Sequence, residues 1–345
     1  MAGADNSSDP ATLDVDGGER MSKLLEVRDL KINFYTYRGV VKALEGVSFA
    51  ISPGESVGLV GETGCGKSVT ARAIMGFVEP PGQVESGEIL LEGQDLLAFS
   101  EREMRHIRGK KISFIFQEPK KALDPTATVG SQLLEAAAVA RGVDRQTGWA
   151  LALETLEQVG LGDAERVMSS YSFELSGGMA QRVMIAMGMV GGSRLMVADE
   201  PTSALDVSIQ AQILRLLKDI RNKQDSALLL ITHDLGVAAE NCDWIIVMYA
   251  GRIVERGPVR EIFRNPAHPY TVKLLNALPA PGRARLEAIP GTVPDLVDPP
   301  KGCRFSNRCE RATELCSQRP PLSDISPEHV VACHHPMREP AEAAE

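Results

Sequence analysis

A glycine-rich loop that could bind phosphate groups has the clearest chemistry in this sequence. Residues 61–68 match the pattern G-x-x-x-x-G-K-S, between an apolar run at 55–61 and a predicted helix at 67–77. Backbone N–H groups at such a strand-to-helix turn, together with Lys67, would bind the β- and γ-phosphates of a nucleotide, and Ser68 would offer its hydroxyl to Mg²⁺. The expected nucleotide contacts here are Gly61, Glu62, Thr63, Gly64, Cys65, Gly66, Lys67, Ser68 and Val69.

Two carboxylates follow a second apolar run. Residues 194–198 predict a buried strand that ends at Asp199 and Glu200. In α/β proteins, ligands bind beyond the carboxyl ends of parallel strands. Asp199 is therefore suited to hold Mg²⁺, and Glu200 to orient and deprotonate a water molecule. Taken alone, the pair equally fits the start of a solvated loop, and the phosphate loop upstream favours the catalytic interpretation.

Segment 174–182, Glu-Leu-Ser-Gly-Gly-Met-Ala-Gln-Arg, provides a second anion-binding helix start. Ser176 would cap the helix, leaving unpaired N–H groups at the glycines that follow it. Combined with the phosphate loop, the segment resembles the signature of ATP-binding-cassette (ABC) ATPases. The resemblance implies that it contacts ATP held by another subunit, so that two subunits arranged head to tail enclose the nucleotide. The residues concerned are Leu175, Ser176, Gly177, Gly178 and Gln181.

The same resemblance assigns the remaining cassette positions. Gln117 ends the strand-like run 114–116 and would reach the metal and the attacking water, while His233 ends the run 228–232 and would contact the γ-phosphate. The catalytic set is Glu200, His233 and Gln117. The Mg²⁺ set is Ser68, Gln117 and Asp199. The loop linking the two nucleotide sites, the D-loop, would be Ser203, Ala204, Leu205 and Asp206.

An aromatic residue upstream of the phosphate loop stacks on adenine in ABC ATPases. Tyr35 and Tyr37 both lie in the expected region, and the spacing favours Tyr37. Either tyrosine could instead pack on a sheet. The resemblance thus implies ATP and Mg²⁺ as cofactors, and hydrolysis of ATP to ADP and phosphate as the reaction.

Residues beyond the cassette resemble the C-terminal extension of ATPase subunits from dipeptide, oligopeptide and nickel importers. Segment 265–271, Asn-Pro-Ala-His-Pro-Tyr-Thr, precedes a short helix, a Pro/Gly-rich stretch and four cysteines. The resemblance covers residues 23–337 and implies a peripheral ATPase subunit at the cytoplasmic face of the inner membrane. Its partners would be a second, non-identical ABC ATPase subunit, two transmembrane permease subunits and, indirectly, an extracytoplasmic substrate-binding protein. Nickel or another small solute is the alternative cargo, and a soluble ABC ATPase uncoupled from transport is the less favoured alternative.

The four cysteines of the extension suit metal ligation better than a disulfide framework in a cytosolic chain. Their spacing matches neither common zinc knuckles nor the ferredoxin run, and it leaves zinc, an iron–sulfur cluster and unligated thiols open. The resemblance implies a structural [4Fe–4S] cluster, with Zn²⁺ as the alternative. Loss of one thiolate should disorder the extension and spare nucleotide binding, if the phosphate loop belongs to a separately packed core. The ligands would be Cys303, Cys309, Cys316 and Cys333.

Composition narrows the classes of partner. The chain of 345 residues has 37 Lys and Arg against 46 Asp and Glu, a formal net charge of −9, so no overall basic field attracts nucleic acid. No apolar run approaches the ~18–20 residues that span a bilayer. Residues 1–20 lack the basic start and apolar centre of a secretory signal, and we expect a disordered tail there.

The strands and helices expected around these residues indicate an α/β fold, and the resemblance implies a phosphate-loop ABC ATPase core. Strands at 23–34, 47–52 and 88–96 predict an antiparallel β subdomain. Helices at 131–140 and 147–159 predict a helical subdomain inserted at about 119–185, and segment 117–135 is the expected docking surface for membrane subunits. Further helices are expected at 207–222 and 235–241. The predicted divisions are a disordered tail at 1–22, a nucleotide-binding domain at 23–258, a small Cys-rich extension at 259–337 and a tail at 338–345.

Overall fold

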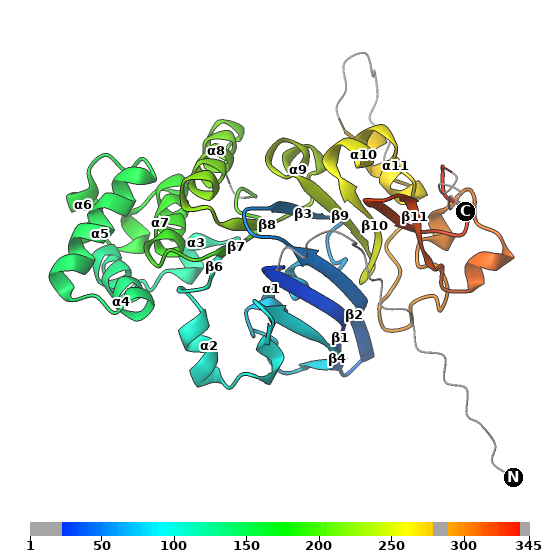
Figure 1. Ribbon diagram of the computed structural model, residues 1–345, viewed down its shortest axis with the longest axis horizontal. Coiled ribbons are helices and arrows are strands. Elements are labelled where there is room, and N and C mark those ends of the chain that lie inside the picture. The colour runs from blue at the N-terminus through cyan, green and yellow to red at the C-terminus, as the bar shows by residue number, and fades with distance from the viewer. Residues whose placement is uncertain (1–22, 204, 279–288, 339–345) are drawn as a thin grey trace, which may run out of the picture.

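Two β-sheets form the centre of the molecule, and helices lie against the larger one (Figure 1). The computed structural model describes residues 23–203, 205–278 and 289–338. The predicted tail at 1–22, and all of the tail at 338–345 except Arg338, fall outside these ranges. The α/β fold with an antiparallel sheet and a helical region is confirmed.

The smaller sheet is antiparallel, with strand order β2-β1-β4-β5. Its strands are β1 (Leu25–Thr36), β2 (Gly39–Ile51), β4 (Gly82–Leu91) and β5 (Gln94–Asp95). The predicted strand at 47–52 begins earlier, because β1 and β2 form a hairpin whose turn ends at Gly39, with a φ of 127° that favours glycine. A short 3₁₀ helix, η1 (Leu96–Ala98), and α2 (Glu101–Ile107) follow, and Ser100 and Glu103 form a capping box at the start of α2.

The larger sheet has eight strands in the order β11-β12-β10-β9-β3-β8-β7-β6. Its parallel strands are short apolar runs covered on both faces, as buried parallel strands require. They are β3 (Ser56–Val60), β6 (Ile112–Ile115), β7 (Leu195–Asp199), β8 (Ala227–Thr232) and β9 (Trp244–Tyr249). The carboxyl ends of these strands therefore meet at one edge of the sheet, where the predicted polar residues lie.

Helices connect these parallel strands and enclose the core. The helix after β3, α1 (Lys67–Ile74), contacts both sheets, and its apolar residues join one buried cluster with Val27, Leu59 and Leu229. It ends before the predicted Phe77 because Gly76 adopts a φ of 68°. Helices α8 (Val207–Gln224) and α9 (Leu235–Asn241) follow the ends of β7 and β8.

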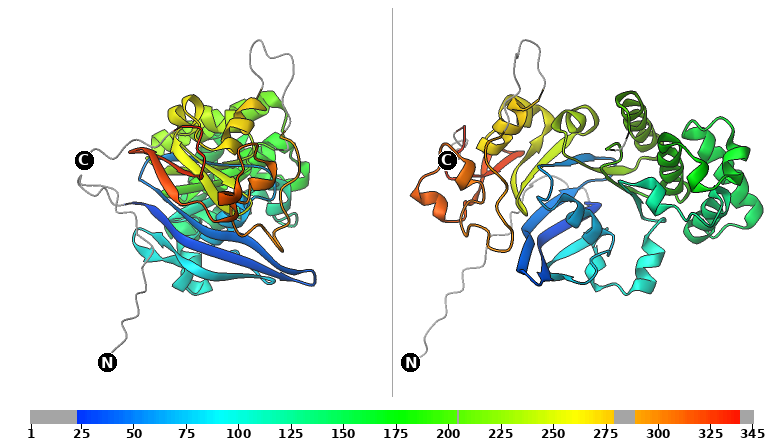
Figure 2. Two further views of the ribbon diagram at one scale, coloured as in Figure 1. Left: turned by 90° about the vertical axis from the view of Figure 1, so that its right-hand side faces the viewer. Right: turned by 180° about the vertical axis from the view of Figure 1, so that it is seen from behind.

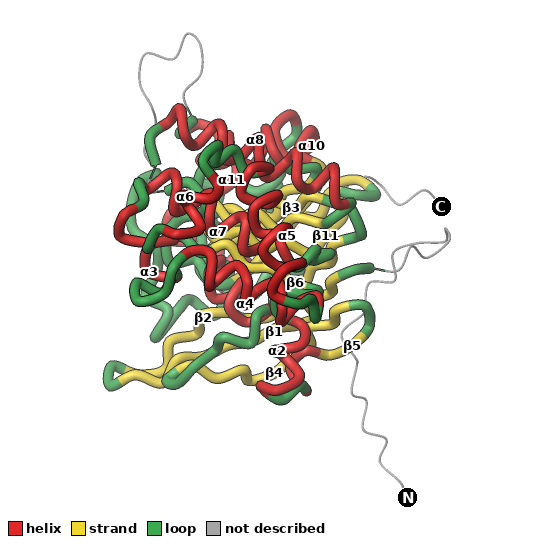
Figure 3. Tube along the Cα trace, turned by 90° about the vertical axis from the view of Figure 1, so that its left-hand side faces the viewer, coloured by secondary structure: helices red, strands yellow, loops and turns green. Residues whose placement is uncertain are grey.

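A helical region projects from the β7–β6 end of the larger sheet (Figure 1), and its helices face the viewer in Figure 3. Its helices are α3 (Pro119–Ala122), α4 (Val129–Arg141), α5 (Arg145–Gln158), α6 (Ala164–Ser169), η2 (Ser172–Glu174) and α7 (Gly177–Val190). Helices α4 and α5 begin earlier than predicted, because Thr128 and Asp144 cap them by accepting backbone N–H groups of Ser131 and Thr147. Within the described ranges, no helix is both long and apolar enough to cross a membrane.

The C-terminal residues continue the larger sheet. Strand β10 (Arg252–Pro258) pairs antiparallel with β12 (His329–Ala332), which forms a hairpin with β11 (Leu322–Ser326), as Figure 2 shows. Helices α10 (Val259–Arg264) and α11 (Pro269–Asn276), with η3 (Ser306–Arg308) and η4 (Glu314–Ser317), complete the region.

Buried contacts also join the extension to the cassette. The Glu255 carboxylate on β10 accepts the backbone N–H groups of Ala267 and His268 at 2.6 and 2.9 Å and lies 2.7 Å from Nε2 of His329. The extension therefore shares a sheet and a buried core with the cassette, and the expectation of a separately packed cassette core is wrong.

Candidate nucleotide-binding site

The phosphate loop joins the end of β3 to the start of α1, as predicted. Its glycines take backbone conformations that other residues rarely adopt, with φ of 152° at Gly61, 81° at Gly64 and 106° at Gly66. A Cβ atom at Gly61 would collide with the carbonyl oxygen of Met248. Thr63 and Gly64 form the exposed tip, and the loop is thus shaped to leave its backbone N–H groups available to an anion.

Lys67 lies folded back over the phosphate loop. Its buried ammonium group donates to the carbonyl oxygens of Gly61 at 2.7 Å and Glu62 at 3.1 Å. Cys65 is buried beneath the loop, and burial raises the pKa of its thiol. The positive charge of Lys67 therefore lies within the loop, and its present acceptors are backbone carbonyls that a phosphate could replace.

Ser68, in the first turn of α1, and Asp199, at the end of β7, are two of the predicted magnesium-binding residues, and the structure brings them together. The Ser68 hydroxyl donates to Oδ1 of Asp199 at 2.9 Å, and Val69 follows half-buried in the first turn of α1. Burial raises the pKa of Asp199, an effect that the hydrogen bond from Ser68 opposes. A hydroxyl and a carboxylate at this separation suit the oxygen coordination that Mg²⁺ prefers.

Glu200 is held at both carboxylate oxygens by the other two predicted catalytic residues. Gln117 donates from Nε2 to Oε2 at 2.9 Å, and Nδ1 of His233 lies 3.2 Å from Oε1. The three residues follow β7, β6 and β8, which are adjacent in the sheet. Glu200 has a φ of 45°, a left-handed conformation that is rare outside glycine and clusters at functional sites.

The signature segment starts α7 in the predicted way. Ser176 caps the helix by accepting the backbone N–H of Met179 at 3.2 Å, and Ser176 and Gly177 are exposed while Gly178 is half-buried. Leu175 and Gln181 are buried. In the described part of the chain, no hydrogen bond joins residues 175–181 to residues 61–69. The anion-binding end of α7 is therefore separate from this chain's own phosphate loop.

The predicted D-loop follows Glu200 directly. The Ser203 hydroxyl donates to the carbonyl oxygen of Glu200 at 3.2 Å, Leu205 is half-buried, and Asp206 precedes α8. Ala204 lies outside the described residues. The contact from Ser203 links the start of this loop to the backbone of the carboxylate residue.

The two candidate adenine-stacking tyrosines differ in their surroundings. Tyr37 lies in the turn between β1 and β2 and is 100% exposed, whereas the Tyr35 hydroxyl donates to Glu85 at 2.8 Å. Tyr37 is therefore free to meet a base, and its assignment stays a prediction.

Two residues of the extension contact the phosphate loop, and neither contact was predicted from the sequence. The Tyr270 hydroxyl accepts the backbone N–H of Glu62 at 2.9 Å, and Arg308 donates to both oxygens of the Glu62 carboxylate at 2.7 and 3.0 Å. These contacts join residues 208 and 246 positions apart. No local pattern signals a contact between residues so distant in the chain.

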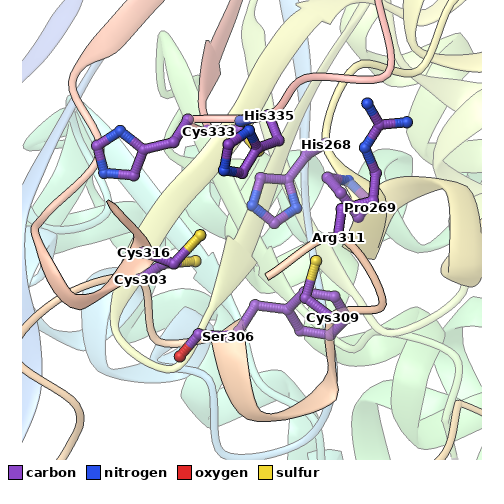
Figure 4. Close-up of a pocket in the computed structure, with 11 residues that line it drawn as sticks. His268, Pro269, Cys303, Ser306, Cys309, Arg311, Cys316, Cys333 and His335 are labelled. Atoms are coloured by element: carbon purple, nitrogen blue, oxygen red, sulfur yellow. The ribbon is translucent and has the colours of Figure 1, made fainter. Parts of the chain in front are cut away.

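The four cysteines of the extension line one small cavity (Figure 4) of about 10 Å³, together with three histidines. Burial raises the pKa of the Cys303 and Cys309 thiols, and that of Cys333 to about 11. Among residues 23–203, 205–278 and 289–338, no group of three or more His, Cys, Asp or Glu side chains has the arrangement of a metal site. This volume accommodates about one water molecule.

The residue types that line the cavity, unlike their arrangement, are suited to a metal cofactor. Four thiols suit either tetrahedral zinc or an iron–sulfur cluster. His268 also lines the cavity, and its buried Nε2 has no hydrogen-bond partner among the described residues. Because Nδ1 of His268 accepts the N–H of Tyr270 at 3.0 Å, the neutral ring carries its proton on Nε2. An unpartnered N–H in a cysteine-lined cavity is suited to a thiolate or sulfide acceptor.

Comparisons with known proteins agree with this geometry. A family model described as ABC transporter matches residues 44–203, and one described as the oligopeptide/dipeptide transporter C-terminal region matches residues 254–316. A probable peptide ABC transporter ATP-binding protein of Sinorhizobium fredii is 48% identical over 315 residues, covering 90% of this chain and 94% of the relative. The chain belongs to the family of ABC transporter ATP-binding proteins.

Other members of the ABC family support the same assignment. The oligopeptide transport ATP-binding protein OppD of Bacillus subtilis is 48% identical over 317 residues, covering 90% of this chain and 88% of the relative. A solved dimeric ATP-binding cassette in a post-hydrolysis state, with ADP and Pi bound, has a TM-score of 0.62 and 26% identity, covering 68% of this chain and 99% of that one. The predicted family is thus confirmed, and the protein is an ABC ATPase that couples ATP hydrolysis to transport.

Proposed function

We propose that this ABC ATPase powers the import of dipeptides or oligopeptides. The match of residues 254–316 to the peptide-transporter C-terminal region supports this cargo, as do relatives named for peptide and oligopeptide transport. Nickel or another small solute is the alternative cargo. An ATPase uncoupled from transport is the further alternative, and it has no support from the C-terminal match.

Nucleotide binding in this proposal uses the residues that meet at the carboxyl ends of the parallel strands. Lys67 would exchange its hydrogen bonds to the carbonyl oxygens of Gly61 and Glu62 for contacts with the β- and γ-phosphates. The backbone N–H groups of the loop would surround these phosphates. Ser68, Asp199 and Gln117 would hold Mg²⁺, which neutralises charge on the phosphates. Tyr37 would stack on adenine.

The observation that carries the catalytic proposal is the fixed Glu200 carboxylate between Gln117 and His233. Glu200 would accept a proton from water as the water oxygen bonds to the γ-phosphorus, and the bond from that phosphorus to the bridging β-oxygen would break, releasing ADP. Lys67 would neutralise charge that develops on the transferred phosphoryl group. His233 would contact the γ-phosphate from the neighbouring strand end.

A second subunit would complete the nucleotide site. The start of α7, with Ser176 and Gly177 exposed, Gly178 half-buried, and Leu175 and Gln181 buried beside them, would meet ATP bound to the partner, and residues 203–206 would connect the two sites. The solved dimeric cassette supports such pairing. The partner would be a second, non-identical ABC ATPase subunit.

Two transmembrane permease subunits would hold the pair at the cytoplasmic face of the membrane, and a substrate-binding protein would act through them. Segment 117–135 is the proposed docking surface, because it begins at the glutamine bonded to Glu200 and continues into α3 and α4. A change at the carboxylate could therefore reach the surface helices.

Assembly with membrane subunits tests the transport proposal. Affinity-tagged protein is purified in detergent from cells that also express the other subunits of the transporter. It should copurify with two permeases and a second ATPase. The complex should hydrolyse ATP faster when a peptide-loaded binding protein is added. Stimulation by a nickel-loaded binding protein alone would decide for the alternative cargo, and a protein isolated without membrane subunits would contradict the coupling role.

The four cysteines are proposed to hold a [4Fe–4S] cluster, with Zn²⁺ as the alternative. Their shared cavity and the unpartnered N–H of His268 support a ligand there. The cofactor would crosslink a region of the chain rich in loops and poor in regular structure. The N–H of His268 would donate to a sulfur atom and fix the ring beside the ligands.

Cys316→Ser tests this ligation. Anaerobically purified protein should be brown and contain about four irons per chain, as expected for a [4Fe–4S] cluster, and the variant should lose most of this iron. The melting temperature of the protein should fall because a crosslink within the extension is lost. Cys242→Ser, which changes a buried cysteine outside the cavity, is the control and should keep its iron.

Other outcomes of the metal analysis are equally decisive. A colourless anaerobic preparation with about one zinc per chain would establish the alternative, since four thiolates also suit tetrahedral zinc. A metal-free protein with a fully ordered extension would refute both kinds of ligation.

A further inference from the structure

Glu62, in the phosphate loop, is held on three sides. Its carboxylate accepts hydrogen bonds from Arg308, and its carbonyl oxygen accepts one from Lys67. Its backbone N–H donates to the Tyr270 hydroxyl. Of these bonds, only that from Lys67 comes from the cassette itself. If Lys67 turns toward a phosphate, the backbone N–H of Cys65, which donates to the Glu62 carbonyl oxygen at 3.2 Å, remains as a bond from the cassette. Arg308 and Tyr270 then hold the carboxylate and the N–H of Glu62 from the extension.

The Arg308 guanidinium is held in place by burial and by hydrogen bonds. Its side chain is 2% exposed, and each of its five N–H donors has an acceptor in reach. Two donate to Glu62, one to the Tyr249 hydroxyl at 3.2 Å, and two to the carbonyl oxygens of Ile289 at 3.3 Å and Pro290 at 2.8 Å. A planar guanidinium whose five donors all have acceptors is held in one orientation. Two of its N–H groups therefore point at the two oxygens of the Glu62 carboxylate.

Aromatic rings connect the Arg308 guanidinium to the rest of the extension. The buried rings of Tyr249, Tyr270 and Phe305 pack with centroids 4.7 to 5.3 Å apart, and Arg308 lies 5.7 Å from the ring of Tyr249. Arg308 directly precedes Cys309, which lines the cysteine cavity. A movement of segment 303–309 would therefore shift the group that holds Glu62.

We propose that Arg308 and Tyr270 are positioning residues that act through Glu62 to hold the phosphate loop in its nucleotide-receiving conformation, so that the C-terminal extension sets the ATP affinity of the cassette. A loop that is already ordered loses less conformational freedom when ATP binds, and its affinity is correspondingly higher. The proposal rests on ATP binding by the phosphate loop and holds with or without a metal in the cysteine cavity. It predicts that damage to the extension weakens ATP binding, in contrast to the sparing expected from the sequence.

A double-mutant cycle between Glu62 and Arg308 tests the proposal. MgATP affinity of the full-length protein is measured by titration calorimetry for Glu62→Gln, Arg308→Ala and the double variant. Each single change should weaken binding by on the order of tenfold, and the double variant should be no weaker than the worse single variant, because both remove one interaction. In the assembled transporter the KM for ATP should rise with little change in kcat. Arg308→Lys should recover only part of the affinity, since an ammonium cannot form the two-pronged contact.

Controls separate positioning from general stability. Lys273→Ala removes an ion pair of 2.6 Å with Glu310 in the same extension; among the described residues neither side chain has a hydrogen bond to the phosphate loop, so ATP affinity should stay unchanged. Tyr270→Phe removes only the hydroxyl that accepts the Glu62 N–H and should weaken ATP binding in a folded protein. If Arg308→Ala fails to fold, Glu62→Gln and Tyr270→Phe decide. Unchanged ATP affinity in both of these variants, or additive effects in the cycle, would overturn the proposal.

Discussion

Glu200→Gln should retain ATP binding and lose ATP hydrolysis by a factor on the order of 10²–10⁴, the usual contribution of a general base. The amide keeps the size of the carboxylate, and its oxygen can still accept the hydrogen bond from Gln117. It cannot accept a proton from water. The variant should therefore accumulate in the ATP-bound, closed dimer.

Phosphate release by the assembled transporter, together with ATP binding to the same preparation, measures this effect. Glu240→Gln changes an exposed glutamate on α9 and serves as the matched control, with wild-type turnover expected. Near-wild-type hydrolysis by Glu200→Gln would remove Glu200 from the role of base.

The second large effect is expected from Ser176→Arg. The substitution removes the cap of α7 and places a bulky cation where the partner's ATP would meet the helix, so turnover should fall by on the order of 10²-fold, comparable to the loss of an anion-stabilising donor. ATP binding to the variant's own phosphate loop should persist, because no hydrogen bond in the described residues joins Ser176 to that loop.

Turnover of the transporter with the variant in one subunit, compared with single-chain ATP affinity, separates the two effects. Ser169→Arg, at an exposed position of α6 in the same helical region, should hydrolyse ATP normally. Robust ATPase activity of the purified monomer at high dilution would contradict a site completed by a second subunit.

The parts of the site that follow from local patterns could be predicted from the sequence. The phosphate loop needs glycine at fixed positions between a strand and a helix, and the structure has Gly61 and Gly66 there with positive φ. Apolar runs end near Gln117, Glu200 and His233, and the resemblance to ABC ATPases assigned Gln117 and His233 to the site. In the structure these runs are the parallel strands β6, β7 and β8, whose carboxyl ends share one edge of the sheet.

Contacts between distant segments could not be predicted in this way. The pairing of β10 with β12, which places Glu255 opposite Val331, and the contact of Arg308 with Glu62 both join residues that are far apart in the chain. Neither has a periodic or spacing signal. The extended start of β2 was also missed, because its partly exposed residues do not alternate as a half-buried strand does. The spacing of the four cysteines gave neither the identity of a ligand nor the size of the cavity that they line.

Peptide-dependent ATP hydrolysis is the most direct test of the central claim that this chain drives peptide import. The transporter is reconstituted in lipid vesicles with its binding protein, and phosphate release is measured with and without a di- or oligopeptide. We predict that peptide accelerates hydrolysis by the wild-type complex and has no effect on the Glu200→Gln complex. Equal hydrolysis with and without every peptide tested, in a complex that contains both permeases, would contradict the account.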